Sequence, residues 1–128
     1  VQPPTPVTDS APAPAPPAAR TESLAIAGLL DGARADAASG RLASAAASLE
    51  RALRIEPRNP RLWQELARVR LKQGDYAQAE SVAARSNSWA GGDSGLRAEN
   101  WRLIAQAREA LGDTAGARAA LETAERQR

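Results

Sequence analysis

The sequence predicts an all-α fold, an α-solenoid built from three helix-turn-helix repeats. Alanine, the strongest helix former, occurs 31 times in the 128 residues. The large apolar residues after position 20 are mostly leucine, and so few β-branched and aromatic side chains argue against a sheet-built core. Five sets of positions recur at intervals of 34 and then 38 residues, as stacked helix pairs require.

Small residues dominate the recurring positions. The sets are Leu29, Trp63 and Trp101; Ala33, Ala67 and Ala105; Gly40, Gly74 and Gly112; Ala45, Ala79 and Ala117; and Leu49, Ala83 and Leu121. The glycines should adopt the left-handed conformation that ends the first helix of each pair. The alanines should let the two helices of a pair cross closely. The spacing therefore predicts repeats at about 26–59, 60–93 and 98–128.

The helix boundaries of repeats one and two follow from their capping residues. The first helix contains Gly28 and Gly32, each costing about 0.5–1 kcal/mol relative to alanine, so it should fray first. Pro57 ends the first pair. Asn59 and Pro60 then cap and start the next helix, and an aspartate after Gly74, Asp75, is expected to cap the second helix of repeat two.

Repeat three follows a stretch that carries the four extra residues. Residues 86–97 are rich in Gly and Ser and are predicted to form a loop, with Asp93 or Ser94 capping the next helix. Asp113 should cap the last helix. Trp89 within this loop has two interpretations: it folds back over the second helix of repeat two, or it is an exposed anchor for a partner.

Residues 1–20 are predicted to be a disordered Pro/Ala-rich linker ahead of a domain at 21–128. Seven of the nine prolines lie in the first 17 residues, and the run at 11–17 favours extended polyproline II geometry. The chain begins at Val1 rather than Met. We interpret it as a fragment or mature form from which an upstream leader or anchor has been removed.

Composition excludes several classes of function. The sequence has no His and no Cys, which removes histidine-dependent triads, thiol nucleophiles and the usual structural zinc sites. No glycine-rich phosphate-binding motif occurs. We therefore expect no catalytic residues, no metal and no cofactor. The net charge is only +2, with acidic residues interleaved among the arginines, so nucleic acid is not an expected partner. No apolar stretch approaches the ~20 residues of a membrane span.

The pattern of repeat two identifies a family. It reads Trp63, Leu66 and Ala67, then Gly74, Asp75 and Tyr76, then Ala79. This resembles the tetratricopeptide repeat, a helix-turn-helix unit of about 34 residues. The resemblance covers about residues 26–128 and implies a scaffold that binds other proteins. The position where the family prefers Tyr holds Asp36, Arg70 and Arg108, so the packing between helices should differ there.

The resemblance also implies a binding surface, the concave face lined by the first helix of each repeat. The family's partner-binding positions fall on Arg34, Arg61, Gln64, Arg68, Lys72, Arg102, Gln106 and Glu109, with Leu71 and Glu99 beside them. This mainly basic set favours a groove for an acidic segment. The alternative is a solvated face with i,i+4 ion pairs, such as Glu65 with Arg61.

A finer resemblance concerns the whole arrangement. An Ala-Pro tether before three repeats, and the stretch from Ser86 through Trp101 to Arg108, resemble pseudomonad outer-membrane lipoproteins that activate a class A penicillin-binding protein. This implies a monomeric, non-enzymatic regulator in the periplasm, tethered to the outer membrane, with that peptidoglycan synthase as partner. Two alternatives remain: a pilotin-like envelope assembly factor, and a cytosolic tetratricopeptide scaffold.

Overall fold

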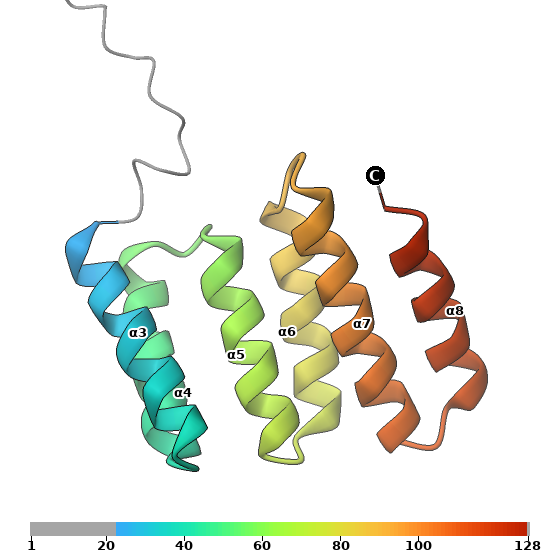
Figure 1. Cartoon of the computed structure of the whole chain (residues 1–128), viewed down its shortest axis with the longest axis horizontal. Helices are drawn as coiled ribbons and strands as arrows, with labels where there is room; N and C mark the ends of the chain where they lie inside the picture. Colours follow the sequence, from blue (N-terminus) through green and yellow to red (C-terminus); the bar gives the residue numbers. More distant parts are fainter. Residues whose placement is uncertain (1–22, 128) are drawn as a thin grey trace, which may run out of the picture.

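Six α-helices make up the part of the chain that the computed structural model describes, residues 23–127. They are α3 (Leu24–Ala38), α4 (Leu42–Ile55), α5 (Pro60–Lys72), α6 (Tyr76–Trp89), α7 (Ser94–Ala110) and α8 (Thr114–Glu125). Figure 1 shows them as successive antiparallel pairs in one row, with α3 at one end and α8 at the other. The predicted all-α solenoid is confirmed. The predicted linker at 1–20 lies outside the described residues.

Glycine ends the first helix of every pair, as predicted. Gly40, Gly74 and Gly112 have φ values of +82°, +78° and +88°, a region that residues with a Cβ rarely adopt. Between the pairs, Asn59 accepts a hydrogen bond from the Arg61 amide at 3.0 Å, and Pro60 is the first helical residue. These residues set where each helix stops and the next begins.

An aspartate side chain caps two of the three helices for which it was expected. The side chain of Asp93, rather than Ser94, accepts from the Leu96 amide at 3.0 Å, and that of Asp113 from the Gly116 amide at 2.9 Å. Asp75 is the N-cap residue of α6, as predicted, but the expected side-chain hydrogen bond is absent.

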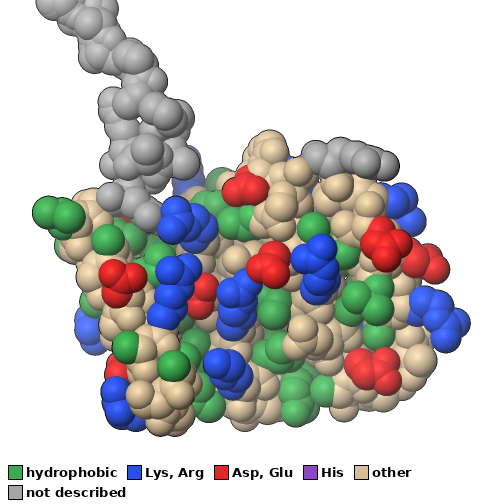
Figure 2. All heavy atoms as spheres, in the orientation of Figure 1, with side chains coloured by type: hydrophobic (Ala, Val, Ile, Leu, Met, Phe, Trp, Pro, Cys, Tyr) green, Lys and Arg blue, Asp and Glu red, His purple; other side chains and the backbone are tan. Residues whose placement is uncertain are grey.

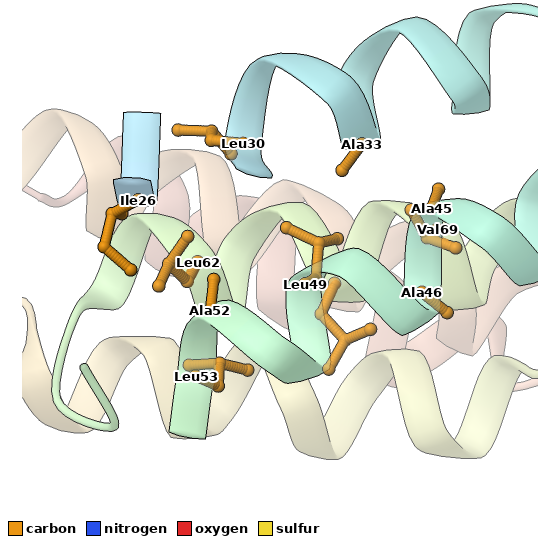
Figure 3. Close-up of a cluster of buried hydrophobic side chains, with 11 residues drawn as sticks. Ile26, Leu30, Ala33, Ala45, Ala46, Leu49, Ala52, Leu53, Leu62 and Val69 are labelled. Atoms are coloured by element: carbon orange, nitrogen blue, oxygen red, sulfur yellow. The ribbon is translucent and has the colours of Figure 1, made fainter. Parts of the chain in front are cut away.

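Two hydrophobic clusters form the core. The first joins α3, α4 and α5 and includes Ile26, Leu49 and Leu62 (Figure 3). The second joins helices α5 to α8 and includes Leu103 and Ile104. The six alanines at the predicted helix crossings are all at most 4% exposed: Ala33, Ala45, Ala67, Ala79, Ala105 and Ala117. Small side chains therefore fill the crossings as the repeat spacing predicted.

The solenoid curves so that the first helices form its inner row. Helix α5 contacts both α3 and α7, whereas within the described residues the second helices α4, α6 and α8 do not contact one another. The first helices are therefore closer together than the second helices. Their exposed sides form the concave face on which partner binding was predicted.

Arginine at the family's tyrosine position changes the packing between repeats. Arg70 on α5 pairs with Glu50 on α4 at 2.8 Å, and Arg108 on α7 pairs with Glu80 on α6 at 2.9 Å. Each pair joins the second helix of one repeat to the first helix of the next. The predicted difference is thus an ion pair between repeats in place of an aromatic ring.

The predicted loop at 86–97 was wrong over most of its length. Helix α6 continues through Trp89 and α7 begins at Ser94, which leaves only residues 90–93 between them. Ser86 is fully buried and its hydroxyl donates to the Pro60 carbonyl at 2.8 Å. This bond satisfies a polar side chain at a position where the other repeats have alanine, so the helix is not interrupted there.

A buried polar network joins repeats two and three. Asn100 is fully buried, and its Nδ2 donates to Ser86 Oγ at 2.8 Å and to Asn87 Oδ1 at 2.9 Å. Its Oδ1 accepts from Gln64 Nε2 at 3.0 Å. Such a network fixes how two elements pack, because each buried polar atom needs its particular partner. It positions α7 against α5 and α6.

Replacing Gly32 by alanine should stabilise the protein by about 0.4–1 kcal/mol, since alanine restricts the unfolded chain and favours helix. Gly32 lies within α3, is exposed, and a Cβ there would meet no atom within 4 Å. Urea unfolding of the Gly32→Ala variant measures the gain. Gly74→Ala is the matched control and should destabilise, because of its positive φ. A loss of stability in Gly32→Ala would contradict the position of α3.

Candidate functional site

Five charged side chains form a continuous row across the concave face. Arg34 on α3 pairs with Glu65 on α5 at 3.2 Å, and Glu65 pairs with Arg68 at 3.3 Å. Arg68 reaches α7, where it pairs with Glu99 at 2.6 Å, and Glu99 lies 3.8 Å from Arg102. We call this row the charge ladder. Figure 2 shows basic and acidic side chains alternating across the face on which α3, α5 and α7 lie.

The ladder combines the two interpretations of this face. Ion pairs do cover it, both between repeats and along single helices: Arg34–Glu65 and Arg68–Glu99 join successive first helices, whereas Glu65–Arg68 and Glu99–Arg102 are i,i+3 pairs within α5 and α7. Arg34 and Arg102 form the ends of the ladder, and each shares its carboxylate with Arg68. The row therefore keeps one more cation than carboxylates, with its two end guanidinium groups about half exposed.

A hollow of about 260 Å³ lies beside the ladder between α3 and α5. Lys72 lines it together with Arg34 and Arg68. Lys72 is exposed and pairs with no carboxylate of residues 23–127. Glu65, which pairs with Arg34 and Arg68, also lines the hollow. Three cations against one carboxylate leave the hollow basic, which favours binding of a further carboxylate through charge-assisted hydrogen bonds.

The other predicted residues fall in different places. Gln106 and Glu109 are exposed on α7, one and two turns beyond Arg102, and Arg61 is exposed at the start of α5. The prediction for Gln64 was wrong. Its side chain is 9% exposed and donates to the Leu96 carbonyl at 3.2 Å as well as to Asn100, so its role is to join the repeats.

Trp89 lies at the end of α6 and not within a loop. Its ring neither folds back into the core nor stands free, since it is 41% exposed and the Arg58 guanidinium lies 5.3 Å from the ring centre. The Arg85 guanidinium lies over the Trp63 ring in the same way, 5.0 Å from the ring centre. The sequence analysis did not find Arg58 or Arg85, because their positions beside tryptophans depend on how α4, α5 and α6 pack.

Side chains that commonly hold metals are scattered. Within residues 23–127 no three of the Asp and Glu carboxylates come together in a group that could hold an ion. Over the same range no helix combines the length and apolarity needed to cross a bilayer.

Comparison with known proteins places the domain in a family. A family model described as tetratricopeptide repeat matches residues 36–98. The solved structure of the globular C-terminal domain of P. aeruginosa LpoP is similar to the chain, with 52% sequence identity and a TM-score of 0.79; the match covers 80% of this chain and 97% of that one. The chain belongs to the tetratricopeptide-repeat family. No curated protein matches its sequence.

This tetratricopeptide-repeat domain is therefore a protein-interaction module, and the predicted resemblance to a pseudomonad protein is confirmed by the LpoP structure. The family model covers the second half of repeat one and all of repeat two. The similarity to the LpoP domain extends over nearly the whole of that domain, so repeat three with its lengthened α7 belongs to the shared architecture.

Proposed function

We propose that this chain is the interaction domain of a periplasmic lipoprotein, tethered to the outer membrane, that activates a class A penicillin-binding protein without itself being an enzyme. The observation that carries the proposal is the 52% identity to the LpoP C-terminal domain over 97% of that domain. Identity at this level over a complete domain supports a shared partner class in addition to a shared fold. A pilotin-like factor and a cytosolic scaffold have no comparable support.

The concave face is the binding surface that we propose for the synthase. The charge ladder and Lys72 present cations along α3, α5 and α7 in the order in which an extended segment would meet them. An acidic segment pairs with Arg68, Lys72 and Arg102 in turn, its carboxylates competing with Glu65 and Glu99 for the ladder arginines. Gln106 and Glu109 extend this surface along α7.

Reversing the charges of Arg68 and Arg102 together should weaken binding of the synthase at least tenfold, a loss of about 1.4 kcal/mol in binding free energy. Single exposed pairs contribute only about 0–1 kcal/mol, so we choose the double variant Arg68→Glu with Arg102→Glu. Much of the loss should appear as slower association at low salt, because charge steers the encounter. Surface plasmon resonance with the purified periplasmic region of a class A penicillin-binding protein measures both rates.

A control variant with the same change in net charge shows whether binding depends on the concave face or only on the net charge of the domain. Arg51 on α4 and Arg118 on α8 are exposed and pair with no carboxylate of residues 23–127, so Arg51→Glu with Arg118→Glu should leave binding nearly unchanged. Equal weakening by both double variants would mean that net charge alone drives association. If Trp89→Ala abolished binding in a folded protein while the concave reversal did not, the concave face would not be the site.

A further inference from the structure

Four side chains form a second surface, which we call the Arg–Trp patch. The Arg85 guanidinium lies 5.0 Å from the centre of the Trp63 ring, and that of Arg58 lies 5.3 Å from the Trp89 ring. Arg85 and Trp89 are one turn apart on α6. Trp63 Nε1 donates at 2.7 Å to the carbonyl of Pro57, the residue before Arg58. These contacts and the one-turn spacing on α6 bring the four side chains together in one patch.

The patch faces away from the charge ladder. Trp63 precedes Glu65 by two residues on α5, which turns its side chain about 200° around the helix. Trp63 accordingly packs at the border of the first hydrophobic cluster on the side of α4 and α6. A partner bound to this patch would leave the concave face open.

The two guanidinium groups of the patch pair with no carboxylate of residues 23–127, whereas six other arginines do: Arg34, Arg41, Arg68, Arg70, Arg102 and Arg108. The nearby carboxylates are engaged elsewhere. Glu56 accepts from Asn59, Glu50 pairs with Arg70, and Glu80 pairs with Arg108. An arginine stacked on an aromatic ring keeps its in-plane N–H groups available for a carboxylate.

Exposed apolar side chains accompany these cations. Trp89 is 41% exposed, and Ile55, which ends α4 three residues before Arg58, is 58% exposed. Tryptophan and arginine are among the residue types most enriched in the residues that carry the binding energy of protein interfaces. We propose that the Arg–Trp patch binds an acidic protein segment that carries a large apolar side chain. Its carboxylates pair with Arg58 and Arg85, and its apolar side chain packs on Trp89.

The chain supplies its own internal control for a test. Trp101 on α7 occupies the position of Trp63 in the repeat spacing, but it packs against the second hydrophobic cluster, and within the described residues no guanidinium group lies over its ring. The three tryptophans of the sequence give three separate indole N–H signals in a nitrogen-15 correlation spectrum. Binding at the patch should move those of Trp63 and Trp89 and leave that of Trp101 in place.

The probe is a terminally blocked synthetic hexapeptide of alternating Asp, Leu and Glu, titrated into the full chain, so that the test does not depend on the synthase. We expect saturable shifts of the Trp63 and Trp89 signals. The matched peptide with Asn and Gln in place of the acids should bind at least tenfold more weakly. Absence of saturable shifts at these two signals, or equal binding of both peptides, would overturn the proposal.

Variants connect the shifts to the two arginines. Arg58→Gln with Arg85→Gln should weaken peptide binding at least tenfold, with an unchanged Trp101 signal reporting the intact fold. Arg118→Gln with Arg126→Gln removes the same charge from two exposed residues, one on α8 and one at its C-cap, and should have no effect. Vesicles of phosphatidylglycerol test the other source of anions: if they moved the Trp63 and Trp89 signals and the acidic peptide did not, the patch would be a lipid site and the proposal would be wrong.

Discussion

Replacing Asn100 by alanine should lower the free energy of unfolding by about 3 kcal/mol, since each buried polar group left without a partner costs about 1–3 kcal/mol. Asn100 is fully buried and bonds Ser86, Asn87 and Gln64 at once. Its loss removes one acceptor from Gln64 and the donors to Ser86 and Asn87, and Ser86 has no exposed surface where water could replace them. Urea unfolding, monitored by helical circular dichroism, measures the effect.

Gln106→Ala is the matched control for this variant, because Gln106 lies on the same helix but is exposed. It should change stability by less than about 0.5 kcal/mol. A loss of similar size in the two variants would show that the network contributes nothing beyond the helix that carries it.

Replacing Ala79 by leucine should cost about 1–3 kcal/mol, the usual cost of overpacking a filled core. Ala79 has no exposed surface and lies at the crossing of α5 and α6. Three additional carbon atoms can enter this crossing only if the two helices separate. The urea midpoint of Ala79→Leu should fall accordingly.

Gln78→Leu provides the comparison, since Gln78 is the preceding residue on α6 and is exposed. Leucine at this exposed position should leave the urea midpoint nearly unchanged. An unchanged midpoint for Ala79→Leu would contradict the close crossing that the alanine spacing predicts and the structure contains.

Local chemistry explains why the architecture could be predicted from the sequence. Gly40, Gly74 and Gly112 each adopt a backbone conformation that residues with a Cβ avoid, and their spacing alone predicts the number of helix pairs. The buried alanines recur at the same intervals because every pair crosses in the same way. Such signals depend on one residue and its nearest turn, so they can be read without knowing the tertiary contacts.

Tertiary contacts explain what could not be predicted. A serine- and glycine-rich stretch normally indicates a loop, but Ser86 is held inside α6 by Pro60 and Asn100, which are distant in the sequence. Gln64 was placed on the concave face by analogy with the family, yet it is turned inward by the same asparagine. A buried polar network has no periodic signal, because it occurs once.

The charge ladder could be predicted from the sequence only in part. Arg34, Arg68 and Arg102 are 34 residues apart, and so are Glu65 and Glu99, although the glycines and tryptophans shift by four more residues in repeat three. Four residues are about one helical turn, so the shift leaves the same face toward the groove. Equal spacing of both signs of charge was therefore a signal for ion pairs between repeats, which the i,i+4 interpretation overlooked.

The most direct test of the central claim is the rate of peptidoglycan synthesis by a purified class A penicillin-binding protein to which the full chain is added. We expect the rate to rise and saturate, and Arg68→Glu with Arg102→Glu to need at least tenfold more protein for the same rise. Arg51→Glu with Arg118→Glu should behave as the unmodified chain. A rate that stays unchanged while the chain is bound at saturation would contradict its proposed role as an activator.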